Sequence, residues 1–339
     1  MPAAEASPPR LPELRHLPRA RGARHRVTRV ALVFPGQGSQ SAGMAADLLD
    51  VPPAPALLDA AAAAGIDLRG ALAGDEEGLR PTEVAQPALL LVEAVLALRL
   101  ASGVPGIEIV GVAGHSVGEY AALVAAGVLE AEVAMRLVTA RGLAMAGMRE
   151  GGMTALLGAT EEVATAVCAE VGASGGGVVV VANLNGPGQV VISGERRALE
   201  AAAALARQRG VRRAMPLRVS GAFHSPLMAG AAEEVGRLID AAPLVDAAVP
   251  VVGNVDGAPL RDAGAIRDRL RRQLASPVRW SDCVASLAGL GAEALVEVGP
   301  GAVLSGLAGR IDPGLRTVQV ASAAAAAGLG DALAGALRG

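Results

Sequence analysis

Lysine is absent from this sequence, and all 30 of its basic residues are arginine. A lysine Schiff base and the lysine of a P-loop are therefore excluded as sources of chemistry. Aromatic residues are scarce as well: two Phe, one Tyr and one Trp in 339 residues. The chain is nevertheless 52% hydrophobic, so Ala, Val and Leu must fill a sizeable core.

Cysteine and long apolar runs are also limited. Cys168 and Cys283 stand too far apart for a metal or redox motif, so the sequence predicts no metal site. We expect both thiols to be buried, in a reducing cytoplasm. The longest apolar candidate for a membrane span, residues 87–100, is interrupted by Glu93 and Arg99. We therefore expect a cytoplasmic protein without a membrane partner.

Charge is unevenly placed along the chain. Residues 1–30 hold seven Arg and two Glu, a net of +5, whereas the remainder holds 23 Arg against 31 Asp and Glu, a net of −8. An acidic body lacks the basic face that nucleic-acid binding requires, so no nucleic-acid partner is expected. Residues 1–28, rich in Pro and Arg and without apolar periodicity, are predicted to form a disordered extension.

Buried strands and helices alternate in the rest of the chain. The apolar run 29–34 ends in a Gly-rich loop, and the run 107–113 leads through a tight turn into a helix at 117–126. This order predicts an α/β fold with a parallel sheet. Further elements are expected at 88–100 (helix), 249–252 and 294–298 (strands), and from Ala321 onwards (helix).

The middle of the chain has a different pattern. Strands are predicted at 153–157, 178–182, 189–192 and 212–217, and helices at 161–171 and 195–208. Their order, βαββαβ, is that of a ferredoxin-like unit. We therefore predict a small ferredoxin-like domain at residues 150–218, inserted into a large domain made of residues 29–149 and 219–339.

A candidate nucleophile lies in the segment Gly114-His-Ser-Val-Gly118. It has the form G-x-S-x-G and stands between a strand and a helix, which is the context that a nucleophile elbow requires. At such a turn the serine hydroxyl is exposed beside the helix N-terminus, where backbone N–H groups favour a developing oxyanion. Ser116 is therefore predicted to be a catalytic nucleophile.

A serine nucleophile needs a base, and histidine is rare here. His16 and His25 lie in the N-terminal extension, and His115 should point away from its neighbour Ser116. His224 remains as the candidate base. No Asp lies between Asp75 and Asp240, and the intervening Glu residues lie on helix-like segments or in the predicted insert. We therefore expect a Ser–His dyad whose imidazole is oriented by a neutral acceptor rather than by an acid.

Two further features favour a binding site. The loop Phe34-Pro-Gly-Gln-Gly-Ser-Gln40 follows the first strand but lacks the third glycine of a nucleotide-binding loop, so it is better placed to bring backbone N–H groups to the active site. Arg141 follows on an apolar helix. It either binds a carboxylate through its planar guanidinium or lies partly exposed at the surface.

Together these segments resemble the malonyl-CoA:acyl-carrier-protein transacylase family and the related acyltransferase domains of polyketide synthases. The resemblance runs from about Val30 to Val320 and rests on co-linear motifs: Phe34-Pro-Gly-Gln-Gly-Ser-Gln, Gly114-His-Ser-Val-Gly-Glu-Tyr, Asn185-Gly-Pro-Gly-Gln-Val-Val-Ile-Ser and Glu297-Val-Gly-Pro-Gly. It implies an α/β-hydrolase-like core with a ferredoxin-like subdomain and an active site in the cleft between them.

The resemblance also implies roles for individual residues. Ser116 would be the nucleophile and His224 the base, oriented by the main-chain carbonyl of Gln273. The backbone N–H groups of Gln37 and Val117 would form the oxyanion hole. Substrate-binding roles would fall on four residues: Arg141 at the malonate carboxylate, Phe223 as a specificity residue that narrows the space for an α-methyl group, and Gln86 and Asn185 nearby.

The implied reaction is transfer of a malonyl group from malonyl-CoA to the phosphopantetheine thiol of an acyl carrier protein, through an ester on Ser116. No bound cofactor is expected, and we expect a monomer. Fatty acid and polyketide synthesis are both compatible with this reaction. Two alternatives remain open: a serine ester or thioester hydrolase with the same elbow, and a non-catalytic docking scaffold for carrier proteins.

Overall fold

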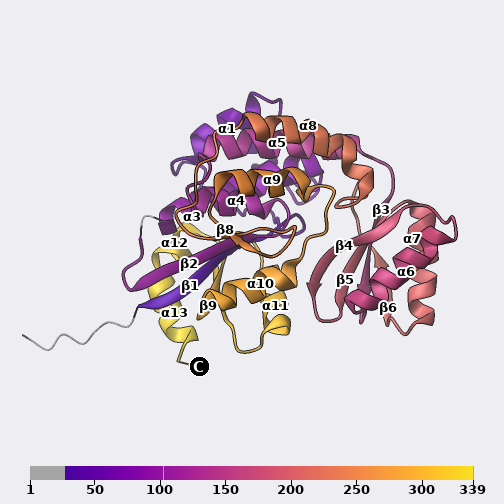
Figure 1. Cartoon of the computed structure of the whole chain (residues 1–339). Helices are drawn as coiled ribbons and strands as arrows, with labels where there is room; N and C mark the ends of the chain where they lie inside the picture. Colours follow the sequence, from indigo (N-terminus) through magenta and orange to yellow (C-terminus); the bar gives the residue numbers. More distant parts are fainter. Residues whose placement is uncertain (1–26, 102, 339) are drawn as a thin grey trace, which may run out of the picture.

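The computed structural model describes residues 27–101 and 103–338. It contains two separate sheets with helices around them, so the predicted α/β architecture with a parallel sheet is confirmed (Figure 1). The predicted disordered extension at residues 1–28 lies outside the described residues, apart from its last two positions. Of these, Thr28 is already part of the first strand.

The larger sheet has six strands in the order β10-β9-β1-β2-β7-β8. All neighbours run parallel except β7 and β8. The predicted strand at 294–298 is found with those bounds, whereas β10 was not predicted, because at the sheet edge only alternate residues are buried. The strands are β1 (Thr28–Phe34), β2 (Ile107–Gly114), β7 (Val251–Val252), β8 (Pro259–Leu260), β9 (Ala294–Val298) and β10 (Arg316–Val320).

Both faces of this sheet are covered, which explains why β1 is a continuous apolar run. Val30, Leu32 and Phe34 belong to a core shared with helices α1–α5, α8, α9, α12 and α13, while Ala31 and Val33 pack in a second core with α10 and α11. The helices on the first face are α1 (Ala54–Ala62), α2 (Leu68–Ala73), α3 (Thr82–Ala101), α4 (Gly118–Ala125), α5 (Ala131–Gly147), α8 (Ala229–Ala241), α9 (Ala263–Gln273), α12 (Ala323–Ala327) and α13 (Leu329–Ala336). Those on the second are α10 (Trp280–Gly289) and α11 (Val303–Ile311).

The smaller sheet has four antiparallel strands in the order β4-β5-β3-β6. Two helices cover one face, and Met153 and Val191 on the other face join the core of the larger sheet. Its elements follow the order βαββαβ along the chain: β3 (Gly152–Leu157), α6 (Glu161–Ala173), β4 (Val179–Gly186), β5 (Gln189–Gly194), α7 (Arg196–Gln208) and β6 (Arg213–Pro216). A short 3-10 helix, η1 (Pro226–Met228), then leads back to α8.

One loop expectation for the smaller sheet is wrong. Residues 183–186, expected in a connection, continue strand β4. Asn183, Leu184 and Gly186 pair with β5. The same stretch also contacts the segment before α10: the Leu184 N–H donates to the Val278 carbonyl at 2.9 Å, and the Val278 N–H donates to the Ala182 carbonyl at 2.8 Å. Pairing within the hairpin and a segment nearly 100 residues away therefore both stabilise the extended backbone that the local sequence does not indicate.

Helix α3 is long and apolar enough to cross a membrane by length and composition alone, but 78% of its apolar window is buried inside the protein. Within it Glu93 is fully buried, and neither carboxyl oxygen has a hydrogen-bonding partner among the described residues. Burial, reinforced by the nearby Glu297 carboxylate, raises the pKa of Glu93 well above its ordinary value of 4.5. Glu93 is therefore held as a neutral acid in the core.

We expect Glu93→Gln to weaken the pH dependence of stability. The folded protein retains a proton on Glu93 that the unfolded chain releases above its ordinary pKa. The contribution of Glu93 to the free energy of unfolding is therefore full at low pH, and it is lost as the pH rises toward the raised pKa of Glu93. Between about pH 5 and pH 8, the free energy of unfolding of the wild type should therefore fall relative to that of the variant. Urea denaturation across that range measures the slope, with Glu234→Gln on the exposed face of α8 as control. Equal slopes in wild type and Glu93→Gln would contradict the buried neutral acid.

Candidate active site

Ser116 lies in the turn between β2 and α4 with φ +53°, a left-handed conformation that is unusual for a residue with a side chain. The flanking glycines leave the necessary space. A Cβ on Gly114 would lie 1.9 Å from the carbonyl carbon of Gly118, and one on Gly118 would lie 2.2 Å from the carbonyl oxygen of Phe34. The two glycines of G-x-S-x-G are thus required by close backbone packing.

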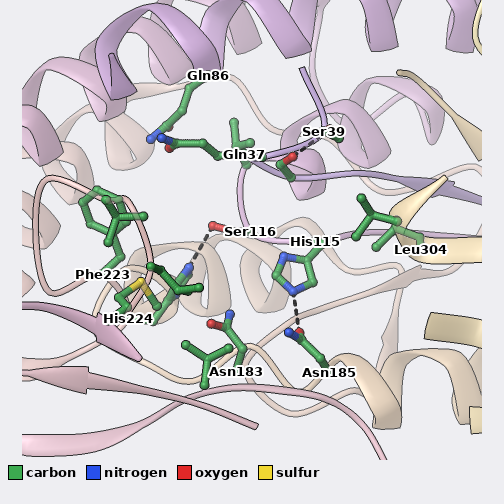
Figure 2. A pocket seen from close by; sticks show the side chains of 18 of the residues that line it. Gln37, Ser39, Gln86, His115, Ser116, Asn183, Asn185, Phe223, His224 and Leu304 are labelled. Carbon is green, nitrogen blue, oxygen red and sulfur yellow. Dashed lines mark hydrogen bonds between the residues drawn. The ribbon is translucent and has the colours of Figure 1, made fainter. Parts of the chain in front are cut away.

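The hydroxyl of Ser116 is hydrogen-bonded to His224, with 2.8 Å between Oγ and Nε2 (Figure 2). The other ring nitrogen, Nδ1, lies 3.1 Å from each of two main-chain carbonyls, those of Gln273 and Ser276. Carbonyl oxygens only accept hydrogen bonds, so Nδ1 carries the proton and Nε2 is free to accept from the serine. The imidazole is thus oriented by neutral acceptors.

His224 is buried, and burial lowers its pKa to about 3, assisted by the positive charge of Arg141. The ring is therefore neutral at neutral pH, which is the form that can accept a proton. It also has φ +57°, so both members of the Ser–His pair have left-handed backbone. Such conformations persist where the surrounding structure fixes them, and they cluster at active sites.

His115 was expected to point away from Ser116. Its ring lines the same cavity, but Nε2 is hydrogen-bonded to Asn185 Oδ1 at 2.9 Å (Figure 2). The ring also packs at a tilt against Trp280, with centroids 5.6 Å apart. Its hydrogen-bonding partner is therefore Asn185 rather than the serine hydroxyl.

Arg141 lies on α5 and is only 1% exposed, which excludes the partly exposed surface arginine. Its Nη1 donates to Gln86 Oε1 at 2.6 Å, and its Nη2 donates to Ser116 Oγ at 3.0 Å and to Gln273 Oε1 at 3.1 Å. Its Nε has no partner, and no carboxylate of the described residues forms an ion pair with it. The hydrogen-bonding partners of this buried guanidinium are neutral, and the Glu119 carboxyl influences it without forming an ion pair, so its charge is incompletely compensated.

These groups face a cavity of about 240 Å³ between the two sheets. The cavity brings together all the predicted site residues except Gln273, which acts through contacts behind it. It is lined by Gln37, Gln86, Ser116, Val117, Arg141, Asn185, Phe223 and His224. Among the described residues, the backbone N–H groups of Gln37 and Val117 donate to no protein acceptor. They are available to an oxyanion, as expected at a loop and a helix N-terminus.

Several residues of the site were not predicted. Asn254 bonds the peptide N–H of Ser116, and Ser276 supplies the second carbonyl to His224. Asn183 lines the cavity beside Asn185 (Figure 2). Nothing in the local sequence marks these residues. Glu119, which is buried behind the serine, lies inside the quoted motif, so its proximity to Ser116 was the one available signal.

Comparison with known proteins shows the family of the chain. The family model described as "Acyl transferase domain" matches residues 31–331. The chain belongs to this acyl transferase family. The match spans both sheets and every residue of the site described above.

Individual members of the family are similar over most of their length. The malonyl CoA-acyl carrier protein transacylase of Bacillus subtilis is 42% identical over 304 residues, 87% of this chain and 94% of that protein. The crystal structure of the malonyl-CoA:acyl carrier protein transacylase of Xanthomonas oryzae has a TM-score of 0.82 at 43% identity, covering 91% of this chain and 98% of that one.

A further solved structure of the family contains a partner. It is a malonyl-transacylase in complex with its type II polyketide synthase acyl-carrier protein. It has a TM-score of 0.81 and 38% identity, covering 89% of this chain and 98% of that chain. At such identity and coverage, this chain and these transacylases share one fold.

We expect Ser116 to stay reactive at lower pH than a histidine of ordinary pKa would allow. Because the neutral form of His224 extends down to about pH 3, modification of Ser116 by a fluorophosphonate should vary less than about twofold in rate between pH 5 and 7. An imidazole titrating at about 6.5 would reduce the rate more than about tenfold over that interval. Intact-protein mass spectrometry measures the rate, with Ser116→Ala as the unlabelled control.

Proposed function

We propose that this acyltransferase moves the malonyl group of malonyl-CoA to the phosphopantetheine thiol of an acyl carrier protein, through an ester on Ser116. One observation carries the choice of acyl group. The buried guanidinium of Arg141 contacts Ser116 Oγ, has a free Nε and forms no ion pair with a carboxylate in the described part of the chain. A malonyl carboxylate would supply that anion in a bidentate contact, which an acetyl group cannot do.

The first half-reaction follows from the hydrogen bonds of Ser116. His224 Nε2 takes the hydroxyl proton as Oγ attacks the thioester carbonyl carbon. The carbonyl oxygen becomes an oxyanion that the N–H groups of Gln37 and Val117 stabilise. The C–S bond then breaks, the coenzyme A sulfur receives the proton from His224, and a malonyl ester remains on Ser116.

The second half-reaction runs through the same groups in reverse. The phosphopantetheine thiol gives its proton to His224 and attacks the ester carbonyl, and Ser116 recovers its proton as the C–O bond breaks. The family member solved with its acyl-carrier protein supports this choice of acceptor. A hydrolase would use water at this step, which is the competing function for the same site.

The finer fold assignment belongs to the same proposal. The six-stranded sheet with its elbow after β2 supports an α/β-hydrolase-like core formed by residues 29–149 and 219–339. The order βαββαβ and the strand order β4-β5-β3-β6 support a ferredoxin-like subdomain at 150–218. The cavity lined from both sheets is then the cleft between the two.

The cofactor requirement, oligomeric state and compartment that we propose follow from the chemistry of the reaction. The reaction needs only groups of this chain and the coenzyme A thioester, so we propose no bound cofactor or metal and a monomeric catalyst. Two free, buried cysteines are consistent with a reducing cytoplasm. The carrier protein would be a transient partner, in either fatty acid or polyketide synthesis.

Phe223 and the two amides are assigned substrate-binding roles. Phe223 is buried next to His224 and lines the cavity, so its ring limits the space for an α-methyl group on the malonyl unit. Asn185 is held by His115, and Gln86 by Arg141. Both lie at the cavity wall, where they can contact the acyl group or the pantetheine arm.

The decisive experiment separates transferase from hydrolase. Brief exposure of the protein to malonyl-CoA should add one malonyl group to Ser116, detected by intact mass and peptide mapping. The adduct should persist until phosphopantetheinylated carrier protein is added and should then disappear as malonyl carrier protein forms. Release of free malonate without a thiol acceptor would indicate the hydrolase. Absence of any adduct, with Ser116→Ala as reference, would indicate a docking scaffold.

Replacing Arg141 by Ala should lower kcat/KM for malonyl-CoA by about 10²–10³-fold, as loss of one partner in a buried charged contact implies. The preference for malonyl-CoA over acetyl-CoA should shrink. This ratio isolates the carboxylate contact, because a change in the pKa of His224 affects both substrates alike. Competition among malonyl-, methylmalonyl- and acetyl-CoA measures it, and methylmalonyl-CoA also reports on Phe223. Arg136→Ala, exposed on the same helix, is the control. An unchanged ratio in Arg141→Ala would disprove the carboxylate contact.

A further inference from the structure

The backbone of Ser116 is held by the side-chain amides of two distant residues. Its N–H donates to Asn254 Oδ1 at 2.7 Å, and its carbonyl accepts from Gln273 Nε2 at 3.0 Å. Asn254 Nδ2 also donates to the Gly114 carbonyl at 2.6 Å, so this one amide spans the turn on the strand side. A left-handed serine is strained and persists only where its surroundings fix it.

One carboxyl group joins these two amides. Glu119 Oε2 accepts from Gln273 Nε2 at 2.7 Å and from the Asn254 backbone N–H at 3.2 Å. All three residues are buried, with 3%, 1% and 0% of their surface exposed for Glu119, Gln273 and Asn254. Asn254 lies between β7 and β8, and Gln273 ends α9, so Glu119 connects two separate segments to the first turn of α4.

Gln273 also contacts the other catalytic and binding groups of the site, so its own position affects theirs. Its main-chain carbonyl accepts from His224 Nδ1, and its Oε1 accepts from Arg141 Nη2. A shift of this one residue would therefore displace Ser116, His224 and Arg141 together. Misplacement of reacting groups by about 1 Å can cost about 10²-fold in rate.

We propose that Glu119 and Asn254 are positioning residues. They hold Ser116 in its left-handed conformation, and they hold Gln273 where it orients His224 and Arg141. Neither residue lines the cavity, so neither touches the substrate. Their effect on malonyl transfer rests on the proposed function, but their effect on the reactivity of Ser116 does not.

The arrangement also decides which N–H groups can serve an oxyanion. The Ser116 N–H is occupied by Asn254 Oδ1, so it is not available at the cavity. The N–H groups of Gln37 and Val117 remain, and both residues line the cavity. Asn254 thus fixes the turn so that the helix N-terminus after the serine, and not the serine's own amide, faces the reacting carbonyl.

Glu119 holds Gln273 and Asn254 through the position of its acceptor oxygen, which depends on the length of the side chain, rather than through its negative charge. Burial raises the pKa of Glu119 to about 7, so the charge is only partly present at neutral pH. An acceptor oxygen remains in both protonation states. Glu119→Gln keeps the length of the side chain and one acceptor oxygen but removes the charge. Glu119→Asp keeps the charge but withdraws the oxygens by one methylene.

The test compares these variants and Asn254→Ala in two assays on the full chain. The first is the rate of Ser116 modification by a fluorophosphonate, which needs no acyl-CoA. The second is steady-state malonyl transfer from malonyl-CoA, resolved into kcat and KM. Thr160→Ala is the control: it removes the cap of α6, far from Ser116, where Thr160 Oγ1 accepts from the Val163 N–H at 3.3 Å. It should lower the unfolding temperature without changing either rate.

We expect Glu119→Asp and Asn254→Ala to lower both the labelling rate and kcat by about 10–10²-fold, with KM changed less than about threefold. Glu119→Gln should stay within about fivefold of wild type. Wild-type labelling in folded Glu119→Asp would overturn the proposal, as would a loss in Glu119→Gln as large as in Glu119→Asp. If Asn254→Ala does not fold, the comparison of Glu119→Asp with Glu119→Gln tests the proposal by itself. Fluorophosphonate rates that follow the expected order without any malonyl adduct in wild type would refute the proposed function and leave the positioning roles standing.

Discussion

The left-handed backbone of Ser116 is the constraint on which the site depends. It requires glycine at 114 and 118, because any side chain there would overlap neighbouring backbone. The resulting close approach places Gly118 against the carbonyl of Phe34, and the His115 N–H donates to that same carbonyl at 2.9 Å. The loop after β1 is thereby fixed beside the start of α4. This contact brings the N–H groups of Gln37 and Val117 to one cavity, so the strained turn builds both the nucleophile and its oxyanion donors.

Buried charge is the second feature of the site, and it is left incompletely neutralised. Arg141 is surrounded by amides and a hydroxyl, with the Tyr120 ring 5.9 Å away, and Glu119 is close enough to influence it without an ion pair. An arginine suits this position because its several N–H donors can be shared among neutral acceptors while its charge remains available. The same charge lowers the pKa of His224. The charge of Arg141 thus contributes to the base strength of His224 and, in the proposed reaction, also binds the malonyl carboxylate.

The parts that the sequence predicts are those encoded within a few residues. The runs that form β1 and β9, and the turn around Ser116, are recognisable because burial on both faces and tight backbone packing leave a local pattern. Strand β10 is only partly buried at the sheet edge, and the extension of β4 through Gly186 is held by β5 and by the distant Val278, so their local pattern is weak. Asn254 shows the same limit within the site. Its partner Ser116 is 138 residues away, and an isolated asparagine carries no sign of that pairing.

The neutral acceptors behind His224 fit a thiol better than water as the second nucleophile. With carbonyls at Nδ1 instead of a carboxylate, the imidazolium gains little stabilisation, and burial lowers the pKa to about 3. Such a weak base still assists a thiol, whose proton is lost at a pKa of about 8.5. It assists water far less, because the pKa of water is about 15.7. This advantage of a thiol applies only to the step that consumes the ester, because in acylation His224 takes the proton of the Ser116 hydroxyl, an alcohol that is a far weaker acid than a thiol. In that step, the carbonyl partners of His224 Nδ1 would favour a thiol over water as the acceptor, in addition to any exclusion of water from the cavity.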